Sequence, residues 1–210
     1  MLFGMQLSVW SAFFVTSLLL AIAPGPDNLF VLVQSASLGA RAGLWVVTGL
    51  LSGIVVQTFA AALGIAAVVA TSPMLFWGIR ILGAAYLLYL AWGAWRAGAA
   101  GKANVYETFS ARSLWQRGFV MNVTNPKVQI FFLAFFPQFV APGSDTWSTA
   151  GQMVVMGITF GLATAIVFAA VALFAGKLAD KLRTPRVQFF MNRVSAVIFV
   201  LLAAGTLLST

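Results

Sequence analysis

The sequence contains no cysteine and no histidine, and charged residues make up only 8% of its 210 positions. Without cysteine or histidine the chain forms no disulfide, offers no thiolate nucleophile and lacks the usual ligands for transition metals and haem. Low charge is equally restrictive, because a soluble domain carries about 25% charged residues. With 61% hydrophobic residues, the composition excludes a soluble fold and predicts a protein in lipid without metal or cofactor.

Charge is missing altogether from four long stretches, residues 1–26, 42–79, 146–176 and 194–210. A helix that crosses the bilayer needs about 20 apolar residues, so these stretches suit membrane spans. Breaker residues divide the chain into six candidate spans over residues 7–38, 44–70, 74–95, 118–140, 148–176 and 187–208. The sequence therefore predicts an all-α membrane protein with six transmembrane helices in a single domain over residues 1–210.

The basic residues indicate the orientation of the spans. Nine of the 12 lie in alternate connections, whereas the connections near residue 72 and over residues 141–146 have none. The positive-inside rule makes the basic side cytoplasmic, so both termini are expected outside a bacterial inner membrane. Because these residues alternate with apolar runs, the net charge of +8 indicates a lipid bilayer as partner and no nucleic acid.

Two of the predicted spans are interrupted. Pro24, Gly25 and Pro26 break the first span, and Asn125-Pro126 breaks the fourth. Proline removes a backbone donor and clashes with the preceding helical turn. At membrane depth the freed backbone groups are tolerated only inside protein or beside a wet cavity. We therefore expect both breaks to face the interior of the helix bundle.

The landmarks of the first half recur in the second half in the same order. Each half has a proline break, a pair of glycines four residues apart and an arginine: Pro26, Gly49, Gly53 and Arg80 against Pro126, Gly157, Gly161 and Arg193. This predicts a three-helix unit used twice, over residues 1–97 and 118–210, with a cytoplasmic linker over 98–117. Three is odd, so the repeats are inverted, as in many secondary transporters. The alternative to a repeat is that these matches arose by chance among apolar residues. The paired glycines predict close packing between helices.

Each break carries one charged residue, Asp27 in the first and Lys127 in the second. An ionised group at that depth costs at least a few kcal/mol, so it is by default paired or functional. Two interpretations stay open. Asp27 and Lys127 pair with each other, or Asp27 holds an ammonium or a coupling proton while Lys127 and helix N-termini hold a carboxylate. Both can apply in different states of one cycle.

The candidate residues for substrate binding or coupling are the helix breakers and their polar neighbours: Pro24, Gly25, Pro26, Asp27, Asn28, Gln57, Asn122, Asn125, Pro126 and Lys127. Gln34 and Gln129 are weaker candidates for polar contacts. Arg80 and Arg193 lie about two turns inside their spans. At that depth a long side chain either reaches the lipid headgroups or contributes a charge to the cavity.

Two segments carry a family resemblance. Ala23-Pro24-Gly25-Pro26-Asp27-Asn28 resembles the N-terminal signature of the LysE/RhtB amino-acid exporter family, and Asn125-Pro126-Lys127 with the phenylalanine-rich run 131–139 resembles its second signature. The resemblance covers nearly the whole chain. It implies export of amino acids or derivatives from the cytoplasm, with the proton gradient as energy source. The RhtB-like branch implies neutral or hydrophobic substrates such as homoserine, threonine or leucine.

Other classes of function fit less well. An intramembrane protease needs a Ser–His or Ser–Lys pair, two aspartates or a metal motif. Histidine is absent, Asp27 is the only acid expected inside the membrane, and no serine neighbours Lys127, so no enzyme is predicted. A transporter or channel for another small solute or ion stays the alternative. The sequence leaves the oligomeric state open, a homo-oligomer included.

Overall fold

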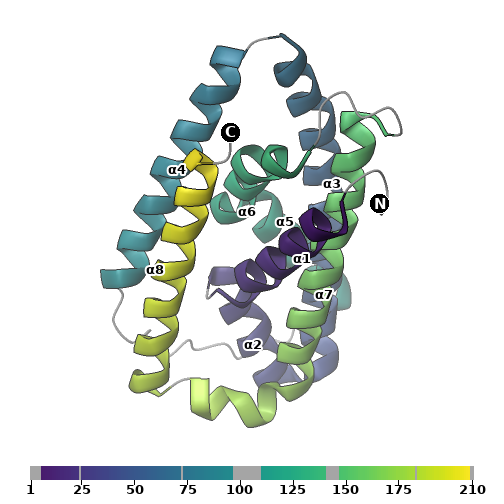
Figure 1. Ribbon diagram of the computed structural model, residues 1–210. Helices are drawn as coiled ribbons and strands as arrows, with labels where there is room; N and C mark the ends of the chain where they lie inside the picture. The colour runs from purple at the N-terminus through teal and green to yellow at the C-terminus, as the bar shows by residue number, and fades with distance from the viewer. Residues whose placement is uncertain are drawn as a thin grey trace.

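The computed structural model describes residues 6–23, 25–71, 73–96, 110–140, 147–182 and 184–208. Within these ranges every regular element is helical, which confirms the all-α prediction (Figure 1). In chain order they are α1 (Leu7–Ile22), α2 (Pro26–Leu38), α3 (Ala40–Thr71), α4 (Pro73–Arg96), α5 (Ala111–Thr124), α6 (Pro126–Ile130), the π-helical turn η1 (Phe131–Phe135), the 3₁₀ turn η2 (Phe136–Phe139), α7 (Thr149–Leu182) and α8 (Pro185–Leu208).

Several of these helices are long and apolar enough to cross a membrane. Among the described residues, Ala40–Gly64, Thr149–Ala175 and Pro185–Leu208 meet this condition on their own. Two more spans result if each broken pair counts as one, since α1 and α2 meet at 61° and α5 meets residues 127–139 at 50°. Both predicted breaks are therefore present, and the described residues hold three to five candidate spans.

The outside of the long helices is covered by large apolar side chains. Val56 on α3, Leu162 on α7 and Leu201 on α8 are 47%, 53% and 65% exposed. A soluble monomer rarely exposes an apolar patch beyond a few hundred Å². Against lipid tails the same surface is favourable, because the tails are as apolar as leucine.

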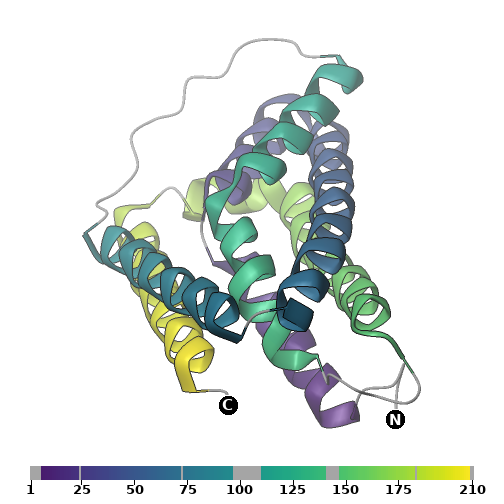
Figure 2. The ribbon, with the colours of Figure 1, turned by 90° about the horizontal axis from the view of Figure 1, so that it is seen from above.

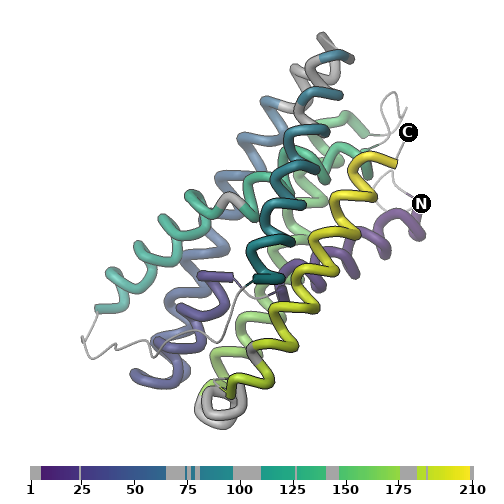
Figure 3. The backbone as a smooth tube through the Cα atoms, turned by 90° about the vertical axis from the view of Figure 1, so that its left-hand side faces the viewer, coloured from purple at the N-terminus to yellow at the C-terminus, as the bar shows by residue number. Residues whose placement is uncertain are grey.

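The helices form two groups. α3 packs against α5 and α7, and α1 and α2 pack against α7. α4 and α8 lie side by side along one flank and meet the first group mainly through α6 and η1 (Figures 1 and 2). Figure 3 shows the first break, where α1 and α2 meet at an angle beside the long helices. The broken helices thus pack against α3 and α7 in the first group.

The fourth predicted span differs from the expectation at both ends. α5 begins at Ala111, so the helix includes residues 111–117 of the expected linker. The cause is Ser110, whose hydroxyl oxygen accepts a hydrogen bond from the Ser113 amide at 3.2 Å and caps the helix. Beyond the break the helix widens into η1 and tightens into η2. Pro137 explains this change, because it has no amide hydrogen and its ring displaces the carbonyl four residues before it.

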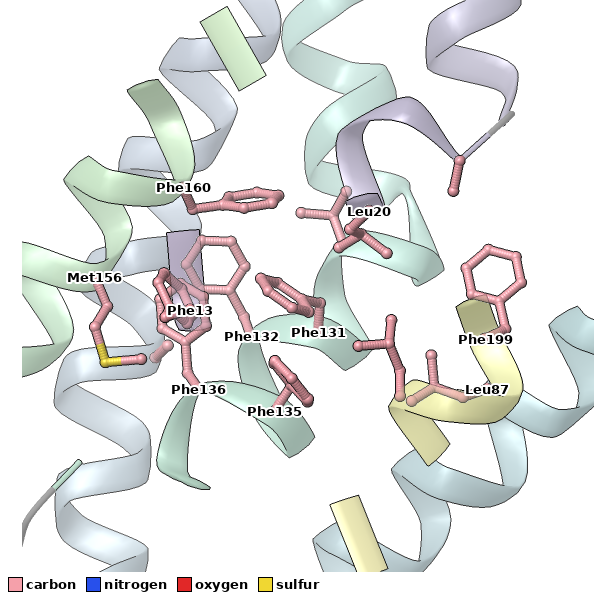
Figure 4. Packing of buried hydrophobic residues seen from close by; sticks show 14 of the residues in the cluster. Phe13, Leu20, Leu87, Phe131, Phe132, Phe135, Phe136, Met156, Phe160 and Phe199 are labelled. Atoms are coloured by element: carbon pink, nitrogen blue, oxygen red, sulfur yellow. The ribbon is translucent and has the colours of Figure 1, made fainter. Parts of the chain in front are cut away.

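Two apolar clusters fill the interior of the bundle. The aromatic cluster joins Phe13 of α1, Phe160 of α7 and Phe131, Phe132 and Phe136 after the second break (Figure 4). Its rings are in direct contact, with centroids 4.2 Å apart for Phe132 and Phe136 and 5.0 Å apart for Phe131 and Phe160. The second, the α2–α3–α7 cluster, comprises Ala21, Val31, Ala42, Val46, Val47, Leu50, Leu114, Phe168 and Ala172.

Glycines let α3 approach its neighbours closely. A Cβ atom on Gly49 would overlap the Trp115 carbonyl of α5, and one on Gly118 would overlap a backbone carbonyl of α3. On α7, a Cβ atom on Gly157 would overlap the Thr58 side chain of α3. The packing role predicted for the paired glycines is thus confirmed at these contacts.

Gly49→Ala is expected to lower the thermal stability of the purified protein. The added methyl group meets a backbone carbonyl that cannot rotate away, and overpacking of this kind costs about 1–3 kcal/mol. Gly64→Ala is the matched control, because it lies on the same helix and its Cβ atom meets nothing within 4 Å. Unfolding midpoints in one detergent compare the two variants; equal midpoints would show that the α3–α5 contact is not tight.

Candidate functional site

The two helix breaks come together in space and leave two helix beginnings in the interior. After α1 ends, Gly25 is extended, with φ −153° and ψ 176°, and Pro26 begins α2, where a missing amide hydrogen is tolerated. At the second break Asn125 ends α5 and caps α6, its side-chain oxygen accepting a hydrogen bond from the Lys127 amide at 3.0 Å. Local sequence therefore accounts for both interruptions.

Asp27 and Lys127 form a buried ion pair at this junction. The distance from Lys127 Nζ to Asp27 Oδ1 is 3.4 Å, and the two residues are 5% and 4% exposed. The ammonium also donates to the Ala23 carbonyl oxygen at 3.2 Å, and Asp27 Oδ1 accepts from the Asn28 amide at 3.1 Å. The interpretation in which the two charges pair describes this structure, whereas their role in binding or coupling stays a prediction.

Helix ends add to the electrostatics of the pair. The Ala23 carbonyl lies at the C-terminal end of α1, which carries partial negative charge and faces the Lys127 ammonium. Asp27 lies in the first turn of α2, where partial positive charge favours a carboxylate. Glycine leaves room for the pair, because a Cβ atom on Gly25 would lie 2.6 Å from Asp27 Oδ1 and 3.0 Å from Lys127 Nζ, so at least the carboxylate would have to shift.

Amide side chains hold the surrounding helices in place. Asn28 donates from Nδ2 to the Ala21 carbonyl at 2.8 Å and so ties the start of α2 to the end of α1. Gln57 of α3 donates from Nε2 to the Asn122 carbonyl at 2.8 Å and to its side-chain oxygen at 3.2 Å. Gly53 makes room for Asn122, whose side chain occupies the place of a Cβ atom.

A small cavity of about 10 Å³ adjoins the ion pair, close to the minimum for one water molecule. Its polar lining consists of Asp27, Asn122, Lys127 and Thr164, and its apolar lining draws on both clusters. The site thus lies where the two apolar clusters meet. Sequence reasoning missed Thr164, because a lone threonine inside the apolar run of α7 carries no local signal.

Some predicted residues lie elsewhere or cannot be placed. Arg193 belongs to the α4–α8 contact, where its guanidinium lies 3.6 Å from the ring centroid of Trp95 and 4.6 Å from that of Phe189. Its predicted role in the cavity stays a prediction. The side chain of Arg80 and all of Pro24 lie outside the described residues.

A second, larger cleft of about 540 Å³ lies between α2 and α5. Pro26, Phe30 and Asn125 line it from the two breaks, and α5 supplies the opposite wall. Its volume falls within the range of about 300–1,000 Å³ that small-molecule sites occupy. The structure therefore has a closed charged centre with an open cleft beside it.

Broken helices that carry a buried charged pair, within an apolar helical bundle, define a multi-pass membrane protein of the transporter class. The family model for LysE type translocators matches residues 18–210. The chain therefore belongs to the LysE type translocator family, a family of transporters, and the resemblance seen in its two motifs is confirmed.

Individual relatives extend this comparison. An "uncharacterized membrane protein" of Vibrio cholerae serotype O1 is 33% identical over 207 residues, 98% of each chain. A membrane protein of Pseudomonas aeruginosa is 35% identical over 128 residues, 58% of this chain and 59% of that protein. A leucine efflux protein of Salmonella choleraesuis is 33% identical over 136 residues, 64% of each chain. No solved structure matches the chain.

Proposed function

We propose that the protein exports neutral or hydrophobic amino acids or their derivatives from the bacterial cytoplasm, driven by the proton gradient. The observation that carries this proposal is the buried Asp27–Lys127 pair at the junction of two helix breaks. A free amino acid presents the same two charges, an ammonium and a carboxylate. The similarity to a leucine efflux protein supports a neutral amino acid as substrate.

The proposed topology has six spans in two inverted repeats, with both termini outside the inner membrane. It counts α4 as a span, since its 24 residues extend about 36 Å against a hydrocarbon core of about 30 Å. Helix contacts support the repeat: α3 packs on its counterpart α7, α4 packs on its counterpart α8, and α3–α5 contacts have their equivalent in α7–α1 and α7–α2. The distribution of basic residues supports the orientation.

In this proposal the ion pair between Asp27 and Lys127 separates, and each of the two residues forms an ion pair with the substrate instead. Asp27 receives the substrate ammonium, and Lys127 together with the partial positive charge at the start of α2 receives the carboxylate. Neither protein charge is left unpaired in lipid, so the exchange avoids the several kcal/mol that a lone buried ion costs. A solute with only one charge leaves one partner unmatched, and so binds less well.

Proton coupling follows from the same carboxylate. When Asp27 takes up a proton from the acidic outer side, it no longer holds an ammonium, and the amino acid is released outward. When the site faces the cytoplasm again, Asp27 loses the proton and recovers its affinity. Outward movement of the amino acid is thus linked to inward movement of a proton.

Buried polar atoms without hydrogen-bond partners support a second conformation, in which the polar side chains of α2 contact water. Within the described residues, Gln34, Ser35 and the side-chain oxygen of Asn28 on α2 are buried without hydrogen-bond partners, as is the Thr164 hydroxyl facing the pair. Each such atom costs about 1–3 kcal/mol. Movement of α2 away from α3 and α7 would hydrate them and open a path to Asp27.

The proposal is tested with purified protein in liposomes loaded with radiolabelled leucine. We expect leucine efflux that an acid-outside gradient accelerates and a protonophore suppresses, because Asp27 must be protonated from outside. Efflux of lysine is expected to be at least about tenfold slower, since its extra charge finds no partner in the site and costs more than about 1.4 kcal/mol.

Two results would contradict the proposal. Leucine efflux no faster than from protein-free liposomes would show that the protein does not export leucine. A steady ionic current without amino-acid movement would favour the channel alternative.

A further inference from the structure

The cleft between α2 and α5 is lined mainly by apolar atoms, with a few polar side chains from α5. Arg117, Val120, Met121 and Thr124 of α5 line it at spacings of three and four residues, which place them on a single helix face. Phe30 of α2 lies opposite. From Arg117 to the second break the wall is eight residues long, about 12 Å, which is enough to hold an extended amino acid.

A few polar side chains lie along the α5 wall of this mainly apolar cleft. Gln116, Arg117 and Thr124 are exposed on α5 and line the cleft. Arg117 is one of the basic residues of the connection expected on the cytoplasmic side, so this end of the cleft is expected to face the cytoplasm. The cleft therefore offers a few polar groups beside an apolar contact area formed by Val120, Met121 and Phe30.

The deep end of the cleft meets the charged centre. Pro26 and Asn125 line that end and are direct chain neighbours of Asp27 and of the Pro126-Lys127 turn. Asn125 is only 4% exposed, and its Nδ2 has no hydrogen-bond partner among the described residues. A buried donor of this kind gains from an incoming acceptor such as a carboxylate oxygen.

We propose that this cleft is a loading site, where neutral amino acids with aliphatic side chains bind before they reach Asp27 and Lys127. The carboxylate lies toward the Asn125 amide, and the aliphatic side chain lies against Val120, Met121 and Phe30. This inference rests on the export function proposed above and adds the route and the side-chain class. A cationic side chain is disfavoured, because no carboxylate lines the cleft within the described residues.

Thiol labelling tests the site directly, because the chain contains no cysteine and every introduced thiol is unique. Met121→Cys in lipid nanodiscs is expected to react with a charged, water-soluble maleimide, and leucine at ten times its dissociation constant is expected to slow the reaction about tenfold. Ala111→Cys, exposed at the start of α5, should react equally with and without leucine. Leu162→Cys, exposed on the apolar face of α7, should not react.

A filling variant supplies the matched transport measurement. Met121→Trp inserts a large side chain into open space, so the protein is expected to fold while leucine efflux falls at least about tenfold, equivalent to about 1.4 kcal/mol. Leu162→Trp adds the same side chain on the face of α7 turned to lipid and should leave efflux unchanged. Membrane abundance of both variants is measured alongside.

The outcomes separate this inference from the export function. If wild-type protein exports leucine but leucine does not protect Met121→Cys, or Met121→Trp exports normally, the loading site is wrong and export stands. An unreactive Met121→Cys would mean that lipid fills the cleft, which also overturns the site. If wild-type protein moves no leucine at all, the export function itself is wrong.

Discussion

Replacing Asp27 with asparagine is expected to abolish amino-acid efflux while the protein still reaches the membrane. Asparagine keeps the shape of the side chain but removes the charge that would bind a substrate ammonium and the site that would carry a proton. A hydrogen bond to a charged group contributes about 1.5–3 kcal/mol, so the lost contact alone slows efflux by about tenfold to a hundredfold. Loss of coupling reduces it to the background rate.

The measurement compares efflux from leucine-loaded liposomes at equal amounts of reconstituted protein. Asp145→Asn is the matched control, because it removes the same charge in a connection between predicted spans, and we expect it to export normally. Residual Asp27→Asn efflux that no longer responds to the pH gradient would assign Asp27 to coupling alone. Unchanged, gradient-driven efflux would exclude both roles.

The second large effect concerns stability and uses both partners of the ion pair. Asp27→Asn leaves the Lys127 ammonium without its carboxylate, and Lys127→Met leaves Asp27 without its ammonium, at a site where both are about 95% buried. Removing one member of a buried pair costs about 3–5 kcal/mol, whereas removing both together is often close to neutral. The double variant is therefore expected to be more stable than either single variant.

Thermal unfolding midpoints of the wild type, the two single variants and the double variant form a double-mutant cycle. We expect a coupling of at least about 1 kcal/mol, which is typical of residues in contact. The double variant should remain unable to export, because its binding site no longer carries the two charges that would bind a zwitterionic amino acid. Additive effects would show that the two groups do not share one interaction, and export by the double variant would separate the pair from the function.

Much of the candidate site could be predicted from sequence because its signals are local. Proline and glycine interrupt helices through their own backbone chemistry, so the breaks at Pro26 and Pro126 are visible without a structure. Charges within apolar runs are equally visible, because lipid makes them expensive. Asp27 and Lys127 can therefore be recognised from the sequence as two opposite charges at matching helix breaks.

Other features depend on contacts that the sequence does not encode locally. The beginning of α5 at Ala111 depends on one hydroxyl, that of Ser110, forming a cap. Arg193 looked equivalent to Arg80 by position, yet Trp95 of α4 occupies its guanidinium face. Thr164 becomes a candidate site residue only because α7 places it in the cavity beside Asp27 and Lys127.

By itself, the sequence determined that this chain is an integral membrane protein, that its helices are apolar on the outside, and that two of them are interrupted next to charged residues. Those properties depend on composition and on single residues, through the free energy of burying charge in lipid and the backbone chemistry of proline. Only the tertiary structure decided that the two charges, 100 residues apart in sequence, lie 3.4 Å apart, and that their neighbours Pro26 and Asn125 line a cleft between α2 and α5. Those properties depend on how closely glycines let α3, α5 and α7 pack, which is a matter of shape across the whole bundle.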